Sequence, residues 1–447
     1  METITLSLIS HTNVGKTTVA RTLLRRDIGE VIDQAHVTVE SEAHTLIETG
    51  DGRLLLWDTP GFGDSARLLK RLRKQENPVR WILGQVWDRI ADRPLWCSQK
   101  AIENIKEHAD VILYLVNASE LPEDAGYVKP ELELLGWLEV PVLFLLNQTG
   151  GVGVDRRGAA GAMGAAGAAE LEGRWRASVE GSPIVREVLP LDAFTRCWVE
   201  EGVLLERVLD ALPEEKRPLM RRLVDAWNER NRRIYGASVE RIARTLAGAA
   251  TARRLLDGSS LSRKAKEGAM AALAAELEQS SQQLLDSLIA EHGLSGRVGE
   301  RIQEEWQQFV DSGESALSPA RGGVIGAVLG GATTGVLVDL KTGGASFGSG
   351  AIIGGVLGGL AGSGLGGLAQ HIKTRAGRAL HWSPEALHQH TRHALLRYLS
   401  VAPFGRGRGE FRPGEGPDPW GDALDGALEE RRERFATIWK EAPAAGE

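Results

Sequence analysis

Cysteine is nearly absent from this 447-residue chain, and so is any excess of positive charge. The two cysteines, Cys97 and Cys197, are too few for a disulfide framework and lack the spacing of metal ligands, which favours a reducing compartment. A formal net charge of −7 argues against a general nucleic-acid-binding surface, because such a surface needs a strong basic excess. No basic region leads into an apolar core near residue 1, so we expect no secretion signal and a cytoplasmic protein.

Glycine, with 54 residues, is abundant and unevenly placed, and its distribution helps to divide the chain. Short apolar runs alternate with amphipathic segments at the start, which is the pattern of an α/β fold. We predict a mostly parallel sheet with helices on both faces in residues 1–212, interrupted by a flexible Gly/Ala-rich insertion at 150–170. The remainder is predicted to be an all-α domain, made of a helical bundle over 213–316, a glycine-rich helical hairpin with a following helix over 317–402, and a linker with a terminal helix over 403–447.

The stretch Ser10–Thr17, SHTNVGKT, ends like a phosphate-binding loop but has a serine where the opening glycine normally stands. An alternating strand over residues 4–10 precedes it and a helix follows from Lys16, which is the context that an anion-binding loop requires. Gly15 lets the backbone approach phosphates, and we expect Lys16 at the β and γ phosphates and Thr17 on Mg²⁺. The alternative is a chance GKT tripeptide at the start of a helix.

Later segments follow the order of a G domain. The segment RLLLWDTPG places Asp58 at the end of a short apolar strand and completes a D-x-x-G motif at Gly61. We expect Asp58 to hold Mg²⁺ through water and the Gly61 amide to sense the γ-phosphate. Two near-continuous apolar runs follow, of the kind found in parallel strands buried on both faces, and the second ends at Asn147. The alternative is a doubly wound domain of unrelated purpose.

The motifs HTNVGKT, WDTPGFGDS and a late LLN resemble those of the Era-like and TrmE-like GTPases. More narrowly, the chain resembles bacterial proteins that join such a G domain to a C-terminal domain of unknown function. The resemblance covers residues 1–150 and implies GTP and GDP as ligands, Mg²⁺ as cofactor, and a switch with slow hydrolysis. The nucleotide-binding residues that it implies are Asn13, Val14, Gly15, Lys16, Thr17, Thr18, Asp58, Gly61 and Asn147.

The guanine-reading motif of these families, N-K-x-D, is altered here to NQTG at residues 147–150. Asn147 can contact the base edge and tie the phosphate loop to the base loop. The missing carboxylate removes the strongest charge-assisted contact to guanine. Asp155 is near enough in sequence to replace it, and residues 191–193 form a candidate base loop. Guanine preference therefore rests on the resemblance, and ATP stays open as an alternative.

The residue after D-x-x-G is Phe62, where other GTPases have a glutamine that orients the attacking water. In TrmE-like relatives a K⁺ ion held partly by a loop asparagine supplies positive charge, and Asn13 matches that asparagine in spacing. The alternative role of Asn13 is a loop-stabilising hydrogen bond. The switch I threonine on Mg²⁺ aligns with Thr38, and Thr45 is the other candidate. The expected catalytic residues are Lys16, Thr38 and Asn13, and the expected metal ligands are Thr17, Thr38 and Asp58.

The tract 322–370 contains two uncharged runs in which glycines recur at every fourth residue. On a helix this spacing makes a smooth stripe for close packing, so we predict a glycine-zipper hairpin. Contact with or insertion into the inner membrane, and a packed helical pair away from it, are both open. Other functions left open are a non-hydrolysing scaffold and a membrane-remodelling or pore-like protein regulated by its G domain. The partners considered are a protein effector and a homodimer, and no specific nucleic acid is expected.

Overall fold

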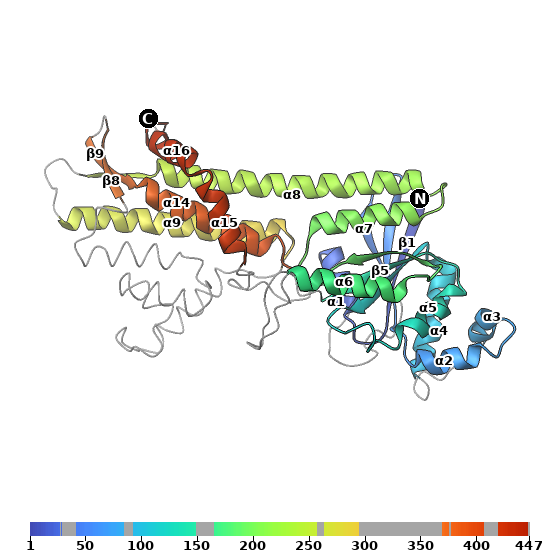
Figure 1. Cartoon of the computed structure of the whole chain (residues 1–447). Helices are drawn as coiled ribbons and strands as arrows, with labels where there is room; N and C mark the ends of the chain where they lie inside the picture. Colours follow the sequence, from blue (N-terminus) through green and yellow to red (C-terminus); the bar gives the residue numbers. More distant parts are fainter. Residues whose placement is uncertain are drawn as a thin grey trace, which may run out of the picture. The chain divides into compact units, whose positions relative to one another are not determined.

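The computed structural model describes residues 1–26, 28, 42–84, 93–148, 165–256, 263–294, 369–374, 377–405 and 419–445. The chain forms two compact units (Figure 1). One consists of Met1–Arg233 with Pro403–Gly409, and the other of Ile234–Ala402 with Glu410–Glu447. Among the predicted features, Thr38, Asp155 and the glycine runs up to residue 368 lie outside the described residues.

The first unit contains a six-stranded sheet in the order β2-β3-β1-β4-β5-β6. Neighbouring strands are parallel except for β2 and β3, which confirms the predicted G-domain fold. The strands are β1 (Glu2–Ser10), β2 (Glu42–Glu48), β3 (Gly52–Asp58), β4 (Val111–Asn117), β5 (Val142–Asn147) and β6 (Val185–Pro190). The helices are α1 (Lys16–Leu24), α2 (Ser65–Leu72), α3 (Pro78–Leu83), α4 (Arg93–His108), α5 (Val128–Gly136), α6 (Ala165–Val179) and α7 (Trp198–Ala211), followed by the first part of α8 (Arg217–Thr251).

Two apolar cores cover the sheet. In β1 the alternating side chains of Ile4, Leu6 and Leu8 are fully buried in one core, together with residues of α1, α7 and α8. In β4 and β5 every second side chain, including those of Tyr114 and Phe144, points into the second core, where it packs with residues of α2, α4, α5 and α6. Strands buried from both sides need apolar residues at nearly every position, which explains the near-continuous runs in the sequence.

The end of the predicted Gly/Ala-rich insertion is helical. Residues from Ala165 onward, which were expected to belong to a flexible insertion ending at 170, form the start of α6. Alanine has the highest helix propensity of all residues. The helix is also held by Trp175, which is fully buried with its ring centroid 5.7 Å from that of Phe144.

The second unit is helical, as predicted, but it also contains three short strands that the prediction of an all-α domain missed. They form an antiparallel sheet in the order β7-β9-β8. Strands of four to six residues with few apolar positions give no clear alternation in the sequence, which is why they were not recognised. No described helix combines the length and hydrophobicity needed to cross a membrane. The elements are the rest of α8, β7 (Arg253–Leu256), α9 (Arg263–Glu291), β8 (Ala369–Thr374), β9 (Gly377–Trp382), α14 (Pro384–Val401), α15 (Pro419–Glu429) and α16 (Arg432–Ala445).

Candidate functional site

The loop between β1 and α1 contains two left-handed residues, Asn13 with φ 64° and Gly15 with φ 92°. A Cβ atom on Gly15 would lie 2.9 Å from the Nδ2 atom of Asn147. Both the backbone conformation and the lack of space therefore require glycine at this position. The loop leads directly into α1 at Lys16, so the N-terminal amides of this helix face the loop, as in an anion-binding arrangement.

Lys16 is held inside the loop by the serine that replaces the usual first glycine. Its ammonium donates a hydrogen bond of 3.0 Å to the Oγ atom of Ser10, and that hydroxyl donates to the carbonyl of His11. Ser10 is the last residue of β1 and has extended backbone, so no glycine is needed there. Burial lowers the pKa of Lys16, and the charges of Asp58 and Glu131 partly offset this effect. A buried ammonium of this kind favours an anion beside it.

Thr17 and Asp58 form an oxygen cluster suited to a hard cation. The Thr17 hydroxyl donates a hydrogen bond of 2.7 Å to Oδ2 of Asp58, whose side chain lies at the end of β3 and is almost fully buried. The other carboxylate oxygen of Asp58, Oδ1, has no hydrogen-bond partner in the described part of the chain. Burial raises the pKa of Asp58, while Lys16 and the Thr17 hydroxyl lower it. A hydroxyl with a buried, incompletely satisfied carboxylate fits Mg²⁺, which prefers oxygen ligands and retains water.

The D-x-x-G motif reaches the phosphate loop through Gly61. A Cβ atom on Gly61 would lie 2.9 Å from the Lys16 ammonium and 3.2 Å from the backbone nitrogen of Thr12. The next residue, Phe62, donates its backbone N–H to the Ser10 carbonyl at 2.9 Å. Its ring is fully buried in the second core. This position therefore presents no polar side chain that could orient a water molecule.

Asn147 joins the phosphate loop to the loop after β6. Its Nδ2 donates to the Val14 carbonyl at 2.9 Å, and its Oδ1 accepts from the backbone N–H of Ala193 at 3.0 Å. The side chain is fully buried. Asn147 thus links the candidate base loop at 191–193 to the phosphate loop. At the end of the base loop, the side chain of Asp192 accepts a hydrogen bond of 2.8 Å from the N–H of Phe194.

Thr45 and Asn13 were the other two candidates from the sequence, one for the switch I threonine and one for a K⁺ ligand. Thr45 lies inside β2 opposite Leu55, so it is fixed in the sheet and does not belong to a switch loop. Asn13 is exposed, and its side chain makes no hydrogen bond with any other described residue, so the loop-stabilising bond is not observed. An exposed amide in the phosphate loop is free to contact a ligand.

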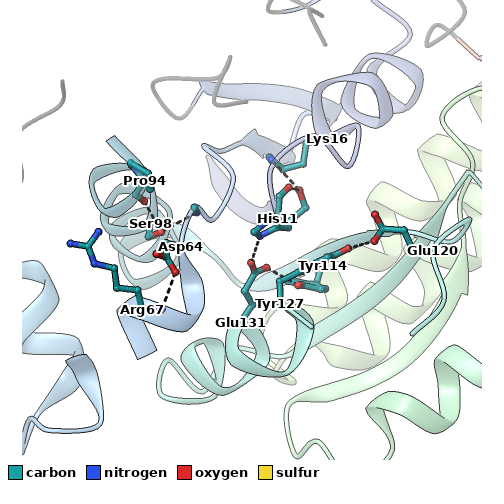
Figure 2. Close-up of polar contacts among 12 residues, drawn as sticks. His11, Lys16, Asp64, Arg67, Pro94, Ser98, Tyr114, Glu120, Tyr127 and Glu131 are labelled. Atoms are coloured by element: carbon teal, nitrogen blue, oxygen red, sulfur yellow. Dashed lines mark hydrogen bonds and ion pairs between the residues drawn. The ribbon is translucent and has the colours of Figure 1, made fainter. Parts of the chain in front are cut away.

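The sequence did not reveal a polar cluster that holds the start of the loop (Figure 2). The Nδ1 atom of His11 lies 2.7 Å from Oε1 of Glu131, and the Tyr114 hydroxyl donates to Oε2 of the same carboxylate at 2.7 Å. The His11 ring stacks on Tyr127 with a centroid distance of 4.3 Å. Glu131 is fully buried, and burial together with its charge raises the pKa of Tyr114.

One feature of the sequence could have identified Glu131 as a buried polar residue. It lies in the apolar stripe of α5, between Val128 and Leu135, both of which are buried. A carboxylate at such a position needs a buried hydrogen-bonding partner, because an isolated charge is costly to bury. Nothing in the sequence points to His11 as that partner, since it lies 120 residues earlier.

Two protein families match the chain. The model for the domain of unknown function DUF3482 matches residues 186–447, and the 50S ribosome-binding GTPase model matches residues 5–148. No curated protein matches the chain significantly.

Solved structures of other proteins also match part of the chain. A variant of Era from Aquifex aeolicus bound to GDP and aluminium fluoride is 19% identical, with a TM-score of 0.32, and the alignment covers 48% of this chain and 58% of that one. A dimerization-deficient variant of Toc33 from Arabidopsis thaliana is 13% identical, with a TM-score of 0.29, and the alignment covers 44% of this chain and 73% of that one. The chain thus spans less than two thirds of the Era structure. Because the DUF3482 model covers more than half of the chain, this protein belongs to the DUF3482 family and carries a P-loop GTPase domain ahead of the domain that defines the family.

Proposed function

We propose that this protein binds GTP with Mg²⁺ and acts as a slowly hydrolysing nucleotide switch. The observation that carries the proposal is the convergence of Lys16, Thr17 and Asp58 where β1 and β3 end. There the Thr17 hydroxyl bonds Asp58, and one buried oxygen of that carboxylate lacks a partner among the described residues. If the hydrogen bond between Thr17 and Asp58 served only to stabilise the fold, we would expect the other buried carboxylate oxygen of Asp58 to have a hydrogen-bond partner as well.

The phosphates are proposed to lie over the loop, with the Lys16 ammonium and the backbone of Val14–Thr18 as their donors. Thr17 and Asp58, together with Thr38, are proposed to hold Mg²⁺. When bound, this ion would neutralise charge on the phosphates. Ser10 accepts a hydrogen bond of 3.0 Å from the Lys16 ammonium, so nucleotide binding would exchange one partner of the ammonium for another.

Guanine is the base that the GTPase family match supports. Asn147 is proposed to act mainly by holding the phosphate loop and the base loop together, since both polar atoms of its side chain already have protein partners. The amide nitrogen carries a second hydrogen, which can still reach a base. ATP is the competing ligand, because the guanine-reading aspartate of the family motif is missing.

For hydrolysis we propose a cation-assisted route. The buried Phe62 offers no group that orients water, whereas the exposed Asn13 amide, in a left-handed backbone conformation, is free to bind K⁺ beside the phosphates. A positive charge at this point would stabilise the charge that develops during phosphoryl transfer.

A second candidate is a nucleotide-binding scaffold without turnover. The complete burial of Phe62 favours it, because a catalytic side chain is missing at the usual position. In either case we propose that the C-terminal part passes the nucleotide state to a protein effector, to a second copy of the chain or to a membrane surface.

The test is equilibrium binding of fluorescent GTP and ATP analogues to the full chain, with turnover followed in potassium and then in sodium buffer. GTP binding that is tighter than ATP binding and is lost in Lys16→Ala supports the switch. Potassium-stimulated turnover that is lost in Asn13→Ala supports the cation-assisted route. Tight binding without turnover supports the scaffold, and equal or absent binding of both nucleotides would refute the proposal.

A further inference from the structure

A segment from near the end of the DUF3482 domain, residues 403–405, packs on the candidate base loop. We call it the strap, and it folds as part of the first unit although α14, which ends at Val401, belongs to the second. We infer that Phe404 and Gly405 are positioning residues for the nucleotide base, which they affect through residues 193–196. This inference rests on the proposed function.

Main-chain hydrogen bonds join the strap to the loop. The N–H of Arg196 donates to the Pro403 carbonyl at 2.7 Å, and the N–H of Gly405 donates to the Phe194 carbonyl at 3.2 Å. Between these bonds, Phe404 forms an antiparallel bridge with Thr195. The strap therefore adds to the loop as a short β-strand would, a mode of contact in which backbone bonds supply affinity.

The side chains of the strap fix its register. Phe404 is almost fully buried, so sliding the strap by one residue would expose its ring. A Cβ atom on Gly405 would lie 2.7 Å from the carbonyl carbon of Phe194, and it would come even closer to the Ala193 carbonyl oxygen. Backbone atoms cannot move aside as flexible side chains do, so only glycine permits this approach.

The part of the loop that the strap touches is also the part that Asn147 holds. Ala193 donates its N–H to Asn147 at 3.0 Å and accepts a hydrogen bond of 2.7 Å from the Thr22 hydroxyl of α1. Asn147 in turn donates to the Val14 carbonyl in the phosphate loop. A continuous series of contacts thus runs from Gly405 through Ala193 and Asn147 to the loop that would hold the phosphates.

A buried ion pair fixes the loop beyond the bridge. The guanidinium of Arg196 lies 2.6 Å from the carboxylate of Glu201 on α7, and it donates to Asn231 on α8 at 3.2 Å. All three side chains are buried. The side chain of Arg196 therefore anchors the loop to two helices while its backbone N–H bonds the strap, so loss of the strap would loosen only the segment around Ala193–Thr195 and would leave its other contacts in place.

This arrangement couples the strap to nucleotide binding. A loop that is ordered in advance loses less conformational freedom when it binds a ligand, so removal of the strap should weaken binding. Coupling between two sites is reciprocal, and bound nucleotide should hold the strap in place to the same degree.

The test uses two variants of the full chain. Gly405→Val prevents the strap backbone from lying close to Ala193 and Phe194, and Phe404→Ala removes the buried ring without a clash. The matched control is Gly426→Val, because nothing lies within 4 Å of a Cβ at that glycine. We expect dissociation of a fluorescent GDP analogue to be about tenfold faster in both strap variants, within the usual range of coupling between sites. We also expect a smaller ratio of GTP to ATP affinity in both strap variants.

Amide hydrogen exchange in the nucleotide-free protein provides a second readout that needs no ligand. Ala193 should exchange faster in both strap variants and at the wild-type rate in Gly426→Val. Wild-type dissociation and wild-type exchange in a folded Gly405→Val or Phe404→Ala variant would overturn the inference. If the unaltered chain binds neither nucleotide, the proposed function fails, and the exchange rates alone decide whether the strap positions the loop.

Discussion

The hydroxyl of Thr17 and the carboxylate of Asp58 lie in hydrogen-bonding contact at 2.7 Å although 41 residues separate them in sequence. Thr17 is in the first turn of α1, and Asp58 is the last residue of β3. Since β3 pairs in parallel with β1, both residues come to the same edge of the sheet. The parallel pairing of these two strands therefore brings the two proposed metal ligands together.

Loss of the Thr17 hydroxyl should selectively weaken Mg²⁺-dependent binding. We expect Thr17→Val, which keeps the side-chain shape, to lower the Mg²⁺ affinity of the nucleotide complex by about 10- to 100-fold. Thr17→Ser keeps the hydroxyl and should behave like the wild type. The measurement is nucleotide retention during a Mg²⁺ titration, and equal Mg²⁺ midpoints for the two variants would contradict the assignment.

A side chain at Gly15 should disrupt the loop for two separate reasons. Its φ of 92° is unfavourable for other residues, and an added Cβ would meet Asn147. We expect Gly15→Ala to lower the free energy of unfolding by about 1–3 kcal/mol and to abolish nucleotide binding. Gly126→Ala, at a glycine with open space around it, is the control for chemical denaturation. A Gly15→Ala variant as stable as this control would show that the loop is not constrained as described.

Replacing Phe62 with glutamine, the residue that other GTPases have at this position, should not introduce their water-orienting mechanism. We expect Phe62→Gln to lower the free energy of unfolding by about 2–5 kcal/mol, because it removes a fully buried ring and places an amide in an apolar core. Turnover should not rise. Phe62→Leu, which stays apolar, should lose less stability, and a rise of GTP turnover in Phe62→Gln would argue against the buried position.

The second unit should lose stability in mild acid because of two histidines on α14. Burial, followed by the charge of Arg397, lowers the pKa of His390 to about 3 and that of His393 to about 4, compared with 6.5 for a free imidazole. Below pH 6.5 the unfolded chain therefore binds protons that the folded unit does not bind. The stability present above pH 6.5 is lost progressively as the pH falls toward 4 and 3.

Amide exchange in α14 at pH 7 and pH 4.5 would measure this loss as a fall in the free energy of local opening. His390→Leu with His393→Gln should flatten the dependence, whereas His388→Gln, on the same helix but less buried than His390, should keep it. If the double variant shows the same dependence as the wild type, other groups are responsible.

Removal of His11 should leave Oε1 of the buried Glu131 carboxylate without its hydrogen-bonding partner, while Oε2 keeps the hydrogen bond from Tyr114. We expect His11→Ala to lower the free energy of unfolding by about 1–3 kcal/mol, the usual cost of an unsatisfied buried group. His11→Gln retains a donor and should recover part of the loss. A His11→Ala variant with wild-type stability would mean that the pair contributes nothing to the loop.

The sequence allowed the sheet, the phosphate loop and the D-x-x-G motif to be predicted, because each follows from local rules. Alternating or continuous apolar runs indicate strands, and Gly15 and Lys16 mark the passage from loop to helix. The buried role of Asn147 was only partly predictable. Its position at the end of β5 follows from the apolar run before it, but its contact with Ala193 depends on the parallel pairing of β5 and β6.

The remaining features depend on contacts between segments that are far apart in sequence. Residues 403–419 were predicted to be a linker, but Phe404 is buried and bridges Thr195. Its glycine- and arginine-rich surroundings in the sequence gave no sign of the loop on which it packs. Likewise, His11 and Glu131 each looked ordinary on their own. Such pairings depend on the three-dimensional fold, and no local pattern in a single sequence reports them.

The strap also has a consequence for the order in which the protein is made. Protein synthesis proceeds from the N-terminus, and the sheet of the first unit is complete long before residue 405 leaves the ribosome. Until then the base loop has no β partner from the strap, and it gains one only after α8, α9 and α14 have been synthesised. A nascent chain, or a fragment that ends after the G domain, therefore has every phosphate-loop residue but lacks the support behind its base loop. Full nucleotide loading would then be one of the last steps in the maturation of the chain.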